Sequence, residues 1–344
     1  MKRRDYPIVG LVASKNPVNA LVLTVESLFK GGAIRVIVVN DGSDDASSVR
    51  IFKKVEKIGG EVIHLSKNVG KANALKEGFK RIPAHSVIIQ TDDDSLSGDL
   101  QKPAEIIRSR RADIVDIRVE AARTKTLIGQ EQEISYWLMN AFIKRVQDRL
   151  NARLWLSGCS LMYSHMAGME LIMRQAQTIT EDTEGLFRAR QKGFVVKYCA
   201  DKSSAFMTMA PEDFKGLHKQ WQRWATGNAQ VMAIYGLGGG STHIAIVNLF
   251  FWFYLLVWPA IPFILNGLVS TLFWWFVSSI LIGIVAALRL NRGYLALVGI
   301  VFPIIGVLWT YHAVEGFWLA YRRTKQGQFN LTWISPKRTL TIDA

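Results

Sequence analysis

Charged residues are missing from three long stretches in the last third of this 344-residue chain. The uncharged stretches are Ile244–Leu265 with 22 residues, Leu268–Leu288 with 21, and the 22 residues between Arg292 and Glu315. About 20 apolar residues in a helix cover the roughly 30 Å hydrocarbon core of a bilayer. A soluble protein would need a very large core to bury three such helices rich in Trp and Phe. We therefore predict transmembrane helices, about three segments, over residues 244–321.

Residues 1–243 have a different composition, with 35 Lys and Arg against 26 Asp and Glu. The basic first residues precede a strand-like segment and not an apolar helix of signal length, so no secretory signal is predicted. The positive balance suits a cytoplasmic domain on the anionic leaflet of a plasma (inner) membrane. Nucleic acid is not an expected partner, because the positive charges form no stripe interleaved with aromatic residues. The spacing of Cys159 and Cys199 indicates reduced thiols.

Short apolar runs rich in Val and Ile alternate with helix-like segments in the first hundred residues. The runs are Ile8–Ala13, Val36–Val39, Glu61–Leu65 and Val87–Gln90. Such alternation predicts an α/β fold with a doubly wound, mostly parallel sheet, and we assign this domain to residues 1–212. Ligands of that architecture bind beyond the carboxyl ends of the strands.

Small polar or acidic residues follow each of these predicted strands. The strand ends carry Ser14-Lys15-Asn16, Asn40-Asp41-Gly42-Ser43, Ser66-Lys67-Asn68-Val69-Gly70-Lys71 and Thr91-Asp92-Asp93-Asp94-Ser95. Any one of them alone could be an ordinary turn or helix N-cap. Four at one sheet edge favour a nucleotide site.

Three adjacent carboxylates follow the apolar strand that ends at Gln90. They would repel each other strongly unless a cation or hydrogen-bond donors neutralise them. Asp92 and Asp94 project to the same side of an extended chain, so one can face the nucleotide while the other reaches Mg²⁺ or Mn²⁺. The sequence therefore predicts a metal site that phosphate oxygens of the substrate complete.

A second acidic pair, Glu181-Asp182, follows a β-like segment ending at Ile179. A carboxylate at such a site can act as a general base that deprotonates a hydroxyl, and Asp182 is the candidate base. The same residues also suit the first turn of a helix that Thr180 caps, and the sequence leaves both interpretations open.

Two helical patterns precede the apolar stretches. One runs from Gln130 to Leu156, directly before Ser157. The other runs from Asp213 to Tyr235 and has Trp and Leu on one side with Lys on the other. We predict an amphipathic interfacial helix in residues 213–243, with a plain core-packing helix as the alternative.

Four motifs of the chain occur in an order that resembles family 2 glycosyltransferases of the GT-A fold. They are Asn40-Asp41-Gly42-Ser43, Asp92-Asp93-Asp94, Thr180-Glu181-Asp182 and Gln220-Trp221-Gln222-Arg223-Trp224. The likeness is to the membrane-integrated branch with cellulose, chitin and hyaluronan synthases. It implies a GT-A catalytic domain followed by transmembrane and interfacial helices, and a UDP-sugar donor.

The resemblance also implies roles for single residues. It places the donor nucleotide at Ser14, Asp41, Lys71, Asp92 and Arg223, and the metal at Asp94 and Asp92. It implies Asp182, with Glu181 beside it, as the catalytic base. Acceptor contacts are expected from Trp224 and from the loop Ser157-Gly158-Cys159, with Gln220, Arg223 and Trp224 forming the Gln-x-x-Arg-Trp motif.

The resemblance predicts an inverting enzyme that extends a β-linked polysaccharide, for which the chain would pair with other chains, for instance as a homo-oligomer. Transfer of one sugar to a lipid is the alternative, because three apolar segments are few for a polymer channel in one chain. A non-catalytic membrane scaffold is a third hypothesis, which the intact acidic motifs oppose.

The C-terminal tail, residues 322–344, is basic. Its Phe329-Asn330-Leu331-Thr332 resembles a gating segment of cellulose synthase. Three full crossings from a cytoplasmic domain would put this basic tail outside, against the positive-inside tendency. Either one apolar segment is re-entrant or interfacial, or the tendency fails here.

Overall fold

The computed structural model describes residues 5–256, 260–301, 308, 311–312, 314–316, 318–320 and 322. The chain divides into two compact units. Unit 1 comprises Met1–Glu120, Lys144–Gln177 and Glu181–Met209, and unit 2 comprises Ala121–Ile143, Thr178–Thr180 and Ala210–Ala344. The later boundary falls close to the predicted domain end at residue 212, but two internal segments belong to unit 2.

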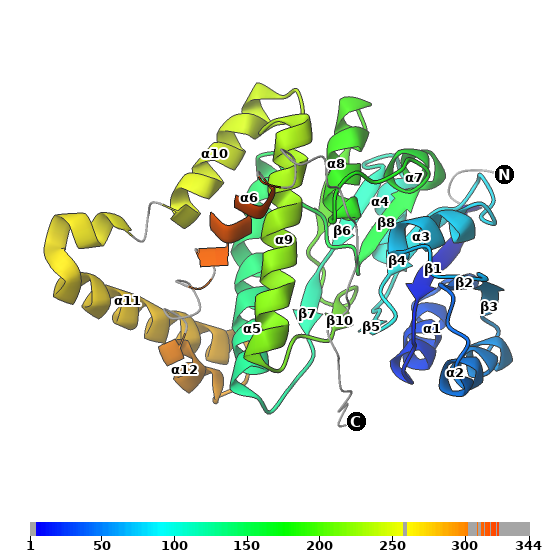
Figure 1. Ribbon diagram of the computed structural model, residues 1–344, viewed down its shortest axis with the longest axis horizontal. Helices are drawn as coiled ribbons and strands as arrows, with labels where there is room; N and C mark the ends of the chain where they lie inside the picture. Colours follow the sequence, from blue (N-terminus) through cyan, green and yellow to red (C-terminus); the bar gives the residue numbers. More distant parts are fainter. Residues whose placement is uncertain are drawn as a thin grey trace. The chain divides into compact units, whose positions relative to one another are not determined.

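In the described part of the chain, unit 1 contains a sheet of seven strands in the order β3-β2-β1-β4-β8-β6-β9, and β5, β10 and β7 form a smaller sheet (Figure 1). In the seven-stranded sheet β8 runs antiparallel to β4 and β6, and the other pairs are parallel. In the smaller sheet β5 and β10 pair antiparallel. The prediction of a mostly parallel α/β fold is confirmed. The strands are β1 (Ile8–Ser14), β2 (Arg35–Asn40), β3 (Glu61–His64), β4 (Val87–Thr91), β5 (Ser95–Leu96), β6 (Ile114–Ile117), β7 (Val119–Ala121), β8 (Leu161–Ser164), β9 (Val196–Cys199) and β10 (Phe206–Thr208).

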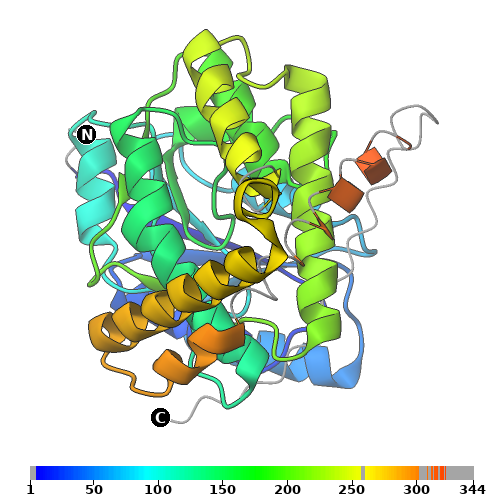
Figure 2. The ribbon, with the colours of Figure 1, turned by 90° about the vertical axis from the view of Figure 1, so that its left-hand side faces the viewer.

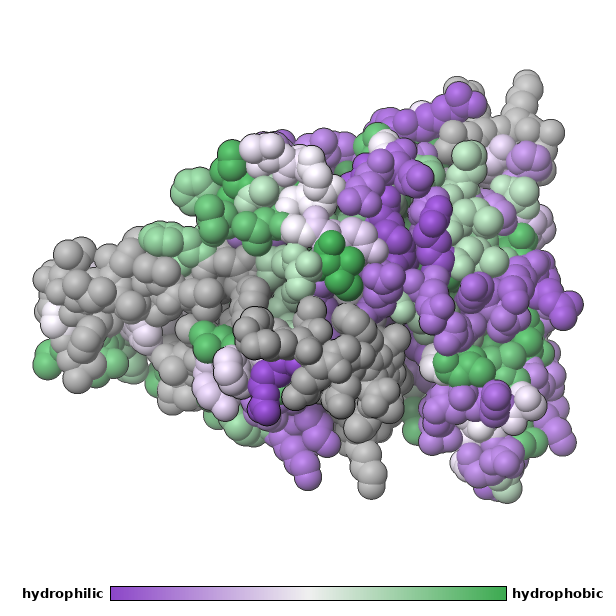
Figure 3. Space-filling model, turned by 45° about the horizontal axis from the view of Figure 1, so that its top comes forward, coloured by the Kyte–Doolittle hydropathy of each residue, from purple (hydrophilic) through white to green (hydrophobic). Residues whose placement is uncertain are grey.

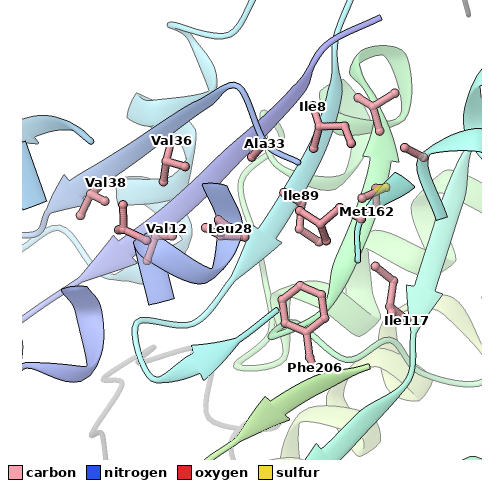
Figure 4. Packing of buried hydrophobic residues seen from close by; sticks show 14 of the residues in the cluster. Ile8, Val12, Leu28, Ala33, Val36, Val38, Ile89, Ile117, Met162 and Phe206 are labelled. Atoms are coloured by element: carbon pink, nitrogen blue, oxygen red, sulfur yellow. The ribbon is translucent and has the colours of Figure 1, made fainter. Parts of the chain in front are cut away.

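Helices cover both faces of the large sheet, which explains why its strands are continuously apolar. Alternate residues of β1 and β2, such as Val12 and Val38, pack with Leu28 in the main core, as Figure 4 shows. The helices of unit 1 are α1 (Ala20–Lys30), α2 (Ala46–Lys57), α3 (Lys71–Phe79), α4 (Gln101–Arg108), α6 (Lys144–Arg149), α7 (His165–Leu171) and α8 (Glu181–Gln191).

Helix α3 packs closely on the opposite face of β1 and β2. A Cβ atom added at Gly78 would lie 2.5 Å from Leu11 Cδ1 and 2.8 Å from Val39 Cγ2. Both neighbours are fully buried, so they have little room to move. This glycine therefore fixes how deeply α3, which begins at Lys71, sits on the strands.

Unit 2 is helical in its described residues. Its elements are α5 (Leu127–Leu138), a π-helical turn (Met139–Ile143), α9 (Phe214–Tyr235), α10 (Thr242–Leu256), α11 (Ala260–Leu290), α12 (Leu295–Val298) and a 3₁₀ turn (Gly299–Val301). Asp213 caps α9 by accepting a hydrogen bond from Gly216 N at 2.6 Å. Leu217 and Trp221 are buried while Lys215 is exposed. The predicted helix is present and amphipathic, but its apolar side packs within unit 2; whether α9 also lies at a membrane interface stays a prediction.

Helix α11 is the most membrane-like element of unit 2. Among the described residues, Leu272–Leu290 is long and apolar enough to cross a membrane, and only 22% of its most apolar window is buried. Figure 3 shows hydrophobic residues along the described surface of this part of the chain. A helix with such exposed side chains as Trp274 and Leu288 does not resemble a buried core helix.

The apolar stretches are less regular than their composition predicts. Gly267 has a non-helical backbone, with φ of 77°, which breaks α11 near its start. The third stretch begins with the short α12, which lies beside α11 in Figure 2. A close approach of Gly283 to Gly299 permits this contact. The rest of that stretch is described only at scattered residues, and the proposed gating segment Phe329–Thr332 lies outside the described residues.

Two local predictions were wrong. The helical pattern expected from Gln130 to Leu156 begins earlier, contains the π-helical turn and ends at Arg149. Ile179 does not lie in a strand. Its backbone N–H donates at 3.2 Å to Gln230 Oε1 of α9, so a side chain takes the place of a neighbouring strand.

We predict that Gly78→Ala lowers the free energy of unfolding. Alanine favours a helix over glycine by up to about 1 kcal/mol, but overpacking a tight core costs about 1–3 kcal/mol. The net loss of about 1 kcal/mol should lower Tm by roughly 2–4 °C. Thermal unfolding checks this, and an unchanged or higher Tm would show that α3 has room to spare.

Candidate active site

The turn after β2 is held rigidly by the side chain of Asn40. Its Oδ1 accepts from Ser43 N at 2.8 Å, and its Nδ2 donates to Ser43 O at 2.9 Å and lies 3.0 Å from His64 Nδ1. Gly42 has φ of 72°, and a Cβ atom there would lie 2.4 Å from Asn68 N. Glycine is therefore required for the turn to approach the loop at residues 66–70.

Asp41 joins this turn to the start of α3. Its carboxylate accepts from Val69 N at 2.7 Å and from Gly70 N at 3.0 Å, and it is buried. The next residue, Lys71, begins the helix. Each carboxylate oxygen has a second lone pair, so these bonds leave acceptor capacity for a nucleotide base.

Lys71 lies between two acidic segments. Its Nζ is 2.5 Å from Asp92 Oδ1 and 3.7 Å from Glu181 Oε1. Burial opposes the charged form, but Asp92, Glu181 and Asp182 outweigh it and hold the pKa of Lys71 above its usual value. A permanent cation thus links the ends of β4 and the start of α8.

The three aspartates after β4 have separate surroundings. Asp93, which the sequence analysis did not single out, accepts from Ser14 Oγ at 2.6 Å. Ser14 therefore holds the acidic turn through this hydrogen bond. Asp94 is buried, and its Oδ1 accepts from Ser95 Oγ at 3.4 Å. Asp93 and Asp94 lie in a turn between β4 and β5, so the chain is not extended here and the expected alternation of Asp92 and Asp94 does not apply.

The oxygen ligands of Asp92 and Asp94 fit a hard divalent cation such as Mg²⁺ or Mn²⁺. Among the described residues, no group of three or more acidic, histidine or cysteine side chains could hold a metal alone. A cation here would need further ligands from a substrate, and Mg²⁺ is usually bound through one or two carboxylates plus phosphate oxygens. The residues present therefore fit a metal that arrives with a diphosphate.

Asp182 lies in the first turn of α8. Its Oδ2 accepts from Gly158 N at 2.9 Å, and its Oδ1 accepts from Thr183 N at 2.7 Å. Burial, with repulsion from Glu181, raises the pKa of Asp182 to about 6. The residue is thus part of a helix turn and also a carboxylate whose proton affinity suits a general base near neutral pH.

The loop Ser157-Gly158-Cys159 is fixed to the end of β4. Thr91 Oγ1 donates to Cys159 O at 2.7 Å, and Gln90 Nε2 donates to Gly158 O at 3.4 Å. Burial raises the pKa of the Cys159 thiol to about 12, which favours the protonated thiol near neutral pH. This loop therefore contributes backbone groups beside Asp182.

Contacts within unit 1 bring together most of the predicted site residues. One continuous chain of contacts links Ser14, Asp41, Lys71, Asp92, Glu181, Asp182, Gly158 and Cys159. Asp94 and Ser157 adjoin members of this chain of contacts in sequence. Three further predicted residues, Gln220, Arg223 and Trp224, lie on α9 of unit 2. Their part in the site stays a prediction.

Residues 11–171 match the family model described as glycosyl transferase family 2. This region is a family 2 glycosyltransferase domain. It contains the Asp41 turn, the aspartates after β4 and the loop at residues 157–159.

Curated relatives are bacterial polysaccharide synthases. The chain is 28% identical over 201 residues to a poly-β-1,6-N-acetyl-D-glucosamine synthase of Staphylococcus aureus (strain COL). It is 26% identical over 201 residues to the protein of the same name from Staphylococcus epidermidis. Each match covers 57% of this chain and 48% of the relative, so the chain spans about half the length of these relatives.

A solved structure supports the fold. A mannosyltransferase from Pyrobaculum calidifontis, in complex with GDP-Man and Mn²⁺, superposes with a TM-score of 0.61 at 13% identity. The likeness covers 92% of this chain and 88% of that one. The glycosyltransferase domain therefore has the GT-A fold.

We predict that Asp182→Asn stabilises the protein above pH 6. The folded state raises the pKa of Asp182 above its unfolded value, so ionisation of the carboxyl costs folding free energy as pH rises through the folded pKa. Asparagine keeps an acceptor for Gly158 N and carries no charge. Its Tm should exceed the wild-type value by about 2–4 °C at pH 8, with the gain shrinking towards pH 4. A gain that is independent of pH would contradict the raised pKa.

Proposed function

We propose that the chain transfers N-acetylglucosamine from UDP-N-acetylglucosamine to a growing β-linked polysaccharide at a membrane. The observation that carries the reaction class is the contact chain around Lys71, which joins the Asp41 turn, Asp92 and the Asp182 loop. The named activity of the staphylococcal relatives supports the sugar and the polymer.

In this mechanism Asp182 takes the proton of the acceptor hydroxyl as its oxygen attacks C1 of the donor sugar. The bond between C1 and the UDP oxygen breaks, and the configuration at C1 inverts. UDP leaves with the bonding electron pair. The hydrogen bond from Gly158 N holds the Asp182 carboxylate in place. The raised pKa of Asp182 lets this carboxylate accept the proton near pH 7.

Donor binding is assigned to the opposite end of the contact chain. Asp41 would accept a hydrogen bond from the uracil, and Lys71 would lie near the nucleotide with Ser14 and Asp92. Asp92 and Asp94 would hold Mg²⁺ or Mn²⁺, which when bound neutralises charge on the leaving diphosphate.

The resemblance also assigns roles to residues of helix α9, and we propose them for this chain. The guanidinium of Arg223 suits a diphosphate, and the indole of Trp224 suits the face of an acceptor sugar. Gln220 belongs to the same motif. The acceptor would also contact the loop Ser157-Gly158-Cys159, whose backbone is fixed beside Asp182.

The membrane assignment rests on the exposed apolar helix Leu272–Leu290 and on the composition of the neighbouring stretches. We propose an integral protein of the plasma (inner) membrane with its catalytic domain in the cytoplasm and with lipids around the apolar segments. Transfer of a single sugar to a lipid is the second candidate, since the described residues include one helix long and apolar enough to span.

We expect membranes containing this chain to convert radiolabelled UDP-N-acetylglucosamine into a high-mass product. That product should be sensitive to a glycosidase that cleaves β-linked N-acetylglucosamine.

Asp182→Asn should release at least about 100-fold less UDP while binding UDP with nearly the wild-type Kd, because the base acts on the acceptor. A product found only in organic solvent would establish the lipid acceptor. Full turnover by the variant would exclude Asp182 as the base.

We expect Asp94→Ala to abolish the Mn²⁺ dependence of UDP binding, because a two-carboxylate site loses half its protein ligands. Titration calorimetry with and without Mn²⁺ measures this effect. Asp99→Ala, which changes an acidic residue outside the contact chain, is the control. Retained Mn²⁺-dependent affinity in the Asp94 variant would remove that residue from the metal site.

A further inference from the structure

Among its buried charges, unit 1 contains a group of three side chains that has no role in the mechanism above. Asp116 of β6 is fully buried, and Lys144 and Arg153 are almost so. Lys144 Nζ lies 3.1 Å from Asp116 Oδ2, and Arg153 forms a second ion pair with the same oxygen. Arg153 also donates to Lys144 O at 3.3 Å. Tyr198 lies against both cations.

One carboxylate would suffice to neutralise one of these cations. Burying a charge is costly unless pairing and hydrogen bonds offset the cost. Arg153 alone would balance Asp116, and burial lowers the pKa of Lys144 to about 7, so the buried lysine needs its own explanation. Lys144 is the member of the group that also contacts residues outside it.

Lys144 reaches the loop beside the candidate base. Its Nζ donates to Ser157 Oγ at 2.8 Å, and Ser157 N donates to Asp116 Oδ1 at 3.3 Å. Both the side chain and the backbone of Ser157 are therefore tied to the buried charges. The following residue, Gly158, donates its backbone N–H to Asp182.

Gly158 has little freedom to move relative to Asp182. A Cβ atom at this position would lie 2.9 Å from Asp182 Oδ2, so the backbone itself approaches the carboxylate. A small displacement of Ser157 would move Gly158 and change the hydrogen bond that its backbone N–H donates to Asp182 Oδ2. The orientation of the carboxylate thus depends on where the buried group places Ser157.

We propose that Lys144, held by Asp116, is a positioning residue that fixes Ser157 and thereby aims the Gly158 N–H at the catalytic base. This inference rests on the proposed role of Asp182. It assigns to a buried lysine an effect on proton transfer without any contact to substrate.

The test compares Lys144→Met and Ser157→Ala, which break the same link from its two sides. Lys144→Met leaves Asp116 paired with Arg153, so the remaining buried charges balance. Each variant should lower kcat about tenfold, the effect of one hydrogen bond that acts on the reacting group. The Kd for UDP should stay within about twofold, because the donor contacts lie elsewhere.

The pH profile separates positioning from general damage to the fold. A hydrogen bond to a carboxylate lowers its pKa, so loss of the Gly158 N–H bond raises the pKa of Asp182. The acid limb of kcat should therefore move to higher pH in both variants. Ser157→Thr keeps the hydroxyl and should restore the wild-type limb.

The double variant should be no slower than the slower single variant, because both changes remove one connection. Lys102→Met is the matched control: its ion pair with Asp201 is exposed and far from the loop in sequence, and it should leave rate and profile unchanged. If Lys144→Met fails to fold, Ser157→Ala with its threonine rescue carries the test.

Wild-type kcat and an unmoved acid limb in folded Ser157→Ala would overturn the positioning role, as would additive losses in the double variant. Asp182→Asn, measured in parallel, separates the proposed role of Asp182 as the base from the proposed positioning role of Lys144. If that variant keeps turnover, the assignment of the base fails. If it loses turnover while the other variants behave as wild type, only the role of Lys144 is overturned.

Discussion

The ion pairs of Lys71 make the rest of the site possible. Carboxylates after β4 and at the start of α8 would repel one another in a half-buried setting, and the ammonium group lies 2.5 Å from Asp92 and 3.7 Å from Glu181. Asp41 holds the loop that places this lysine at the first position of α3. The Asp41 turn, the aspartates after β4 and the proposed base Asp182 are therefore coupled through one cation, so movement of any one of them changes the surroundings of the others.

Much of this arrangement could be predicted from the sequence, because parallel strands bring their carboxyl ends to one edge. The Val- and Ile-rich runs located β1 to β4, and the residues after β1, β2 and β4 proved to be in contact. Asp182 follows about 90 residues later, so a motif and not periodicity identified it. Asp116, Lys144 and Arg153 were not predictable, since nothing in their local sequence signals that they meet in the core.

Composition predicted helices in the apolar part of the chain but not where they break. Gly267 interrupts α11, and the third uncharged stretch starts with the short α12 beside α11. Hydropathy shows whether an apolar stretch is long enough to span a bilayer. It does not show close contacts between glycines such as Gly283 and Gly299. Likewise Ile179 looked like the end of a strand, whereas its N–H bonds to the Gln230 side chain. A side chain that accepts the hydrogen bond of a backbone N–H, in place of a neighbouring strand, leaves no periodic pattern in the sequence.

The most direct test of the account is an experimental structure with UDP-N-acetylglucosamine and Mn²⁺ bound to the Asp182→Asn variant. We expect the uracil beside Asp41, the cation between the diphosphate and Asp92 or Asp94, and the C1 atom of the sugar facing the substituted side chain at position 182. A nucleotide bound away from the Lys71 contacts, with the cation on other residues, would contradict it.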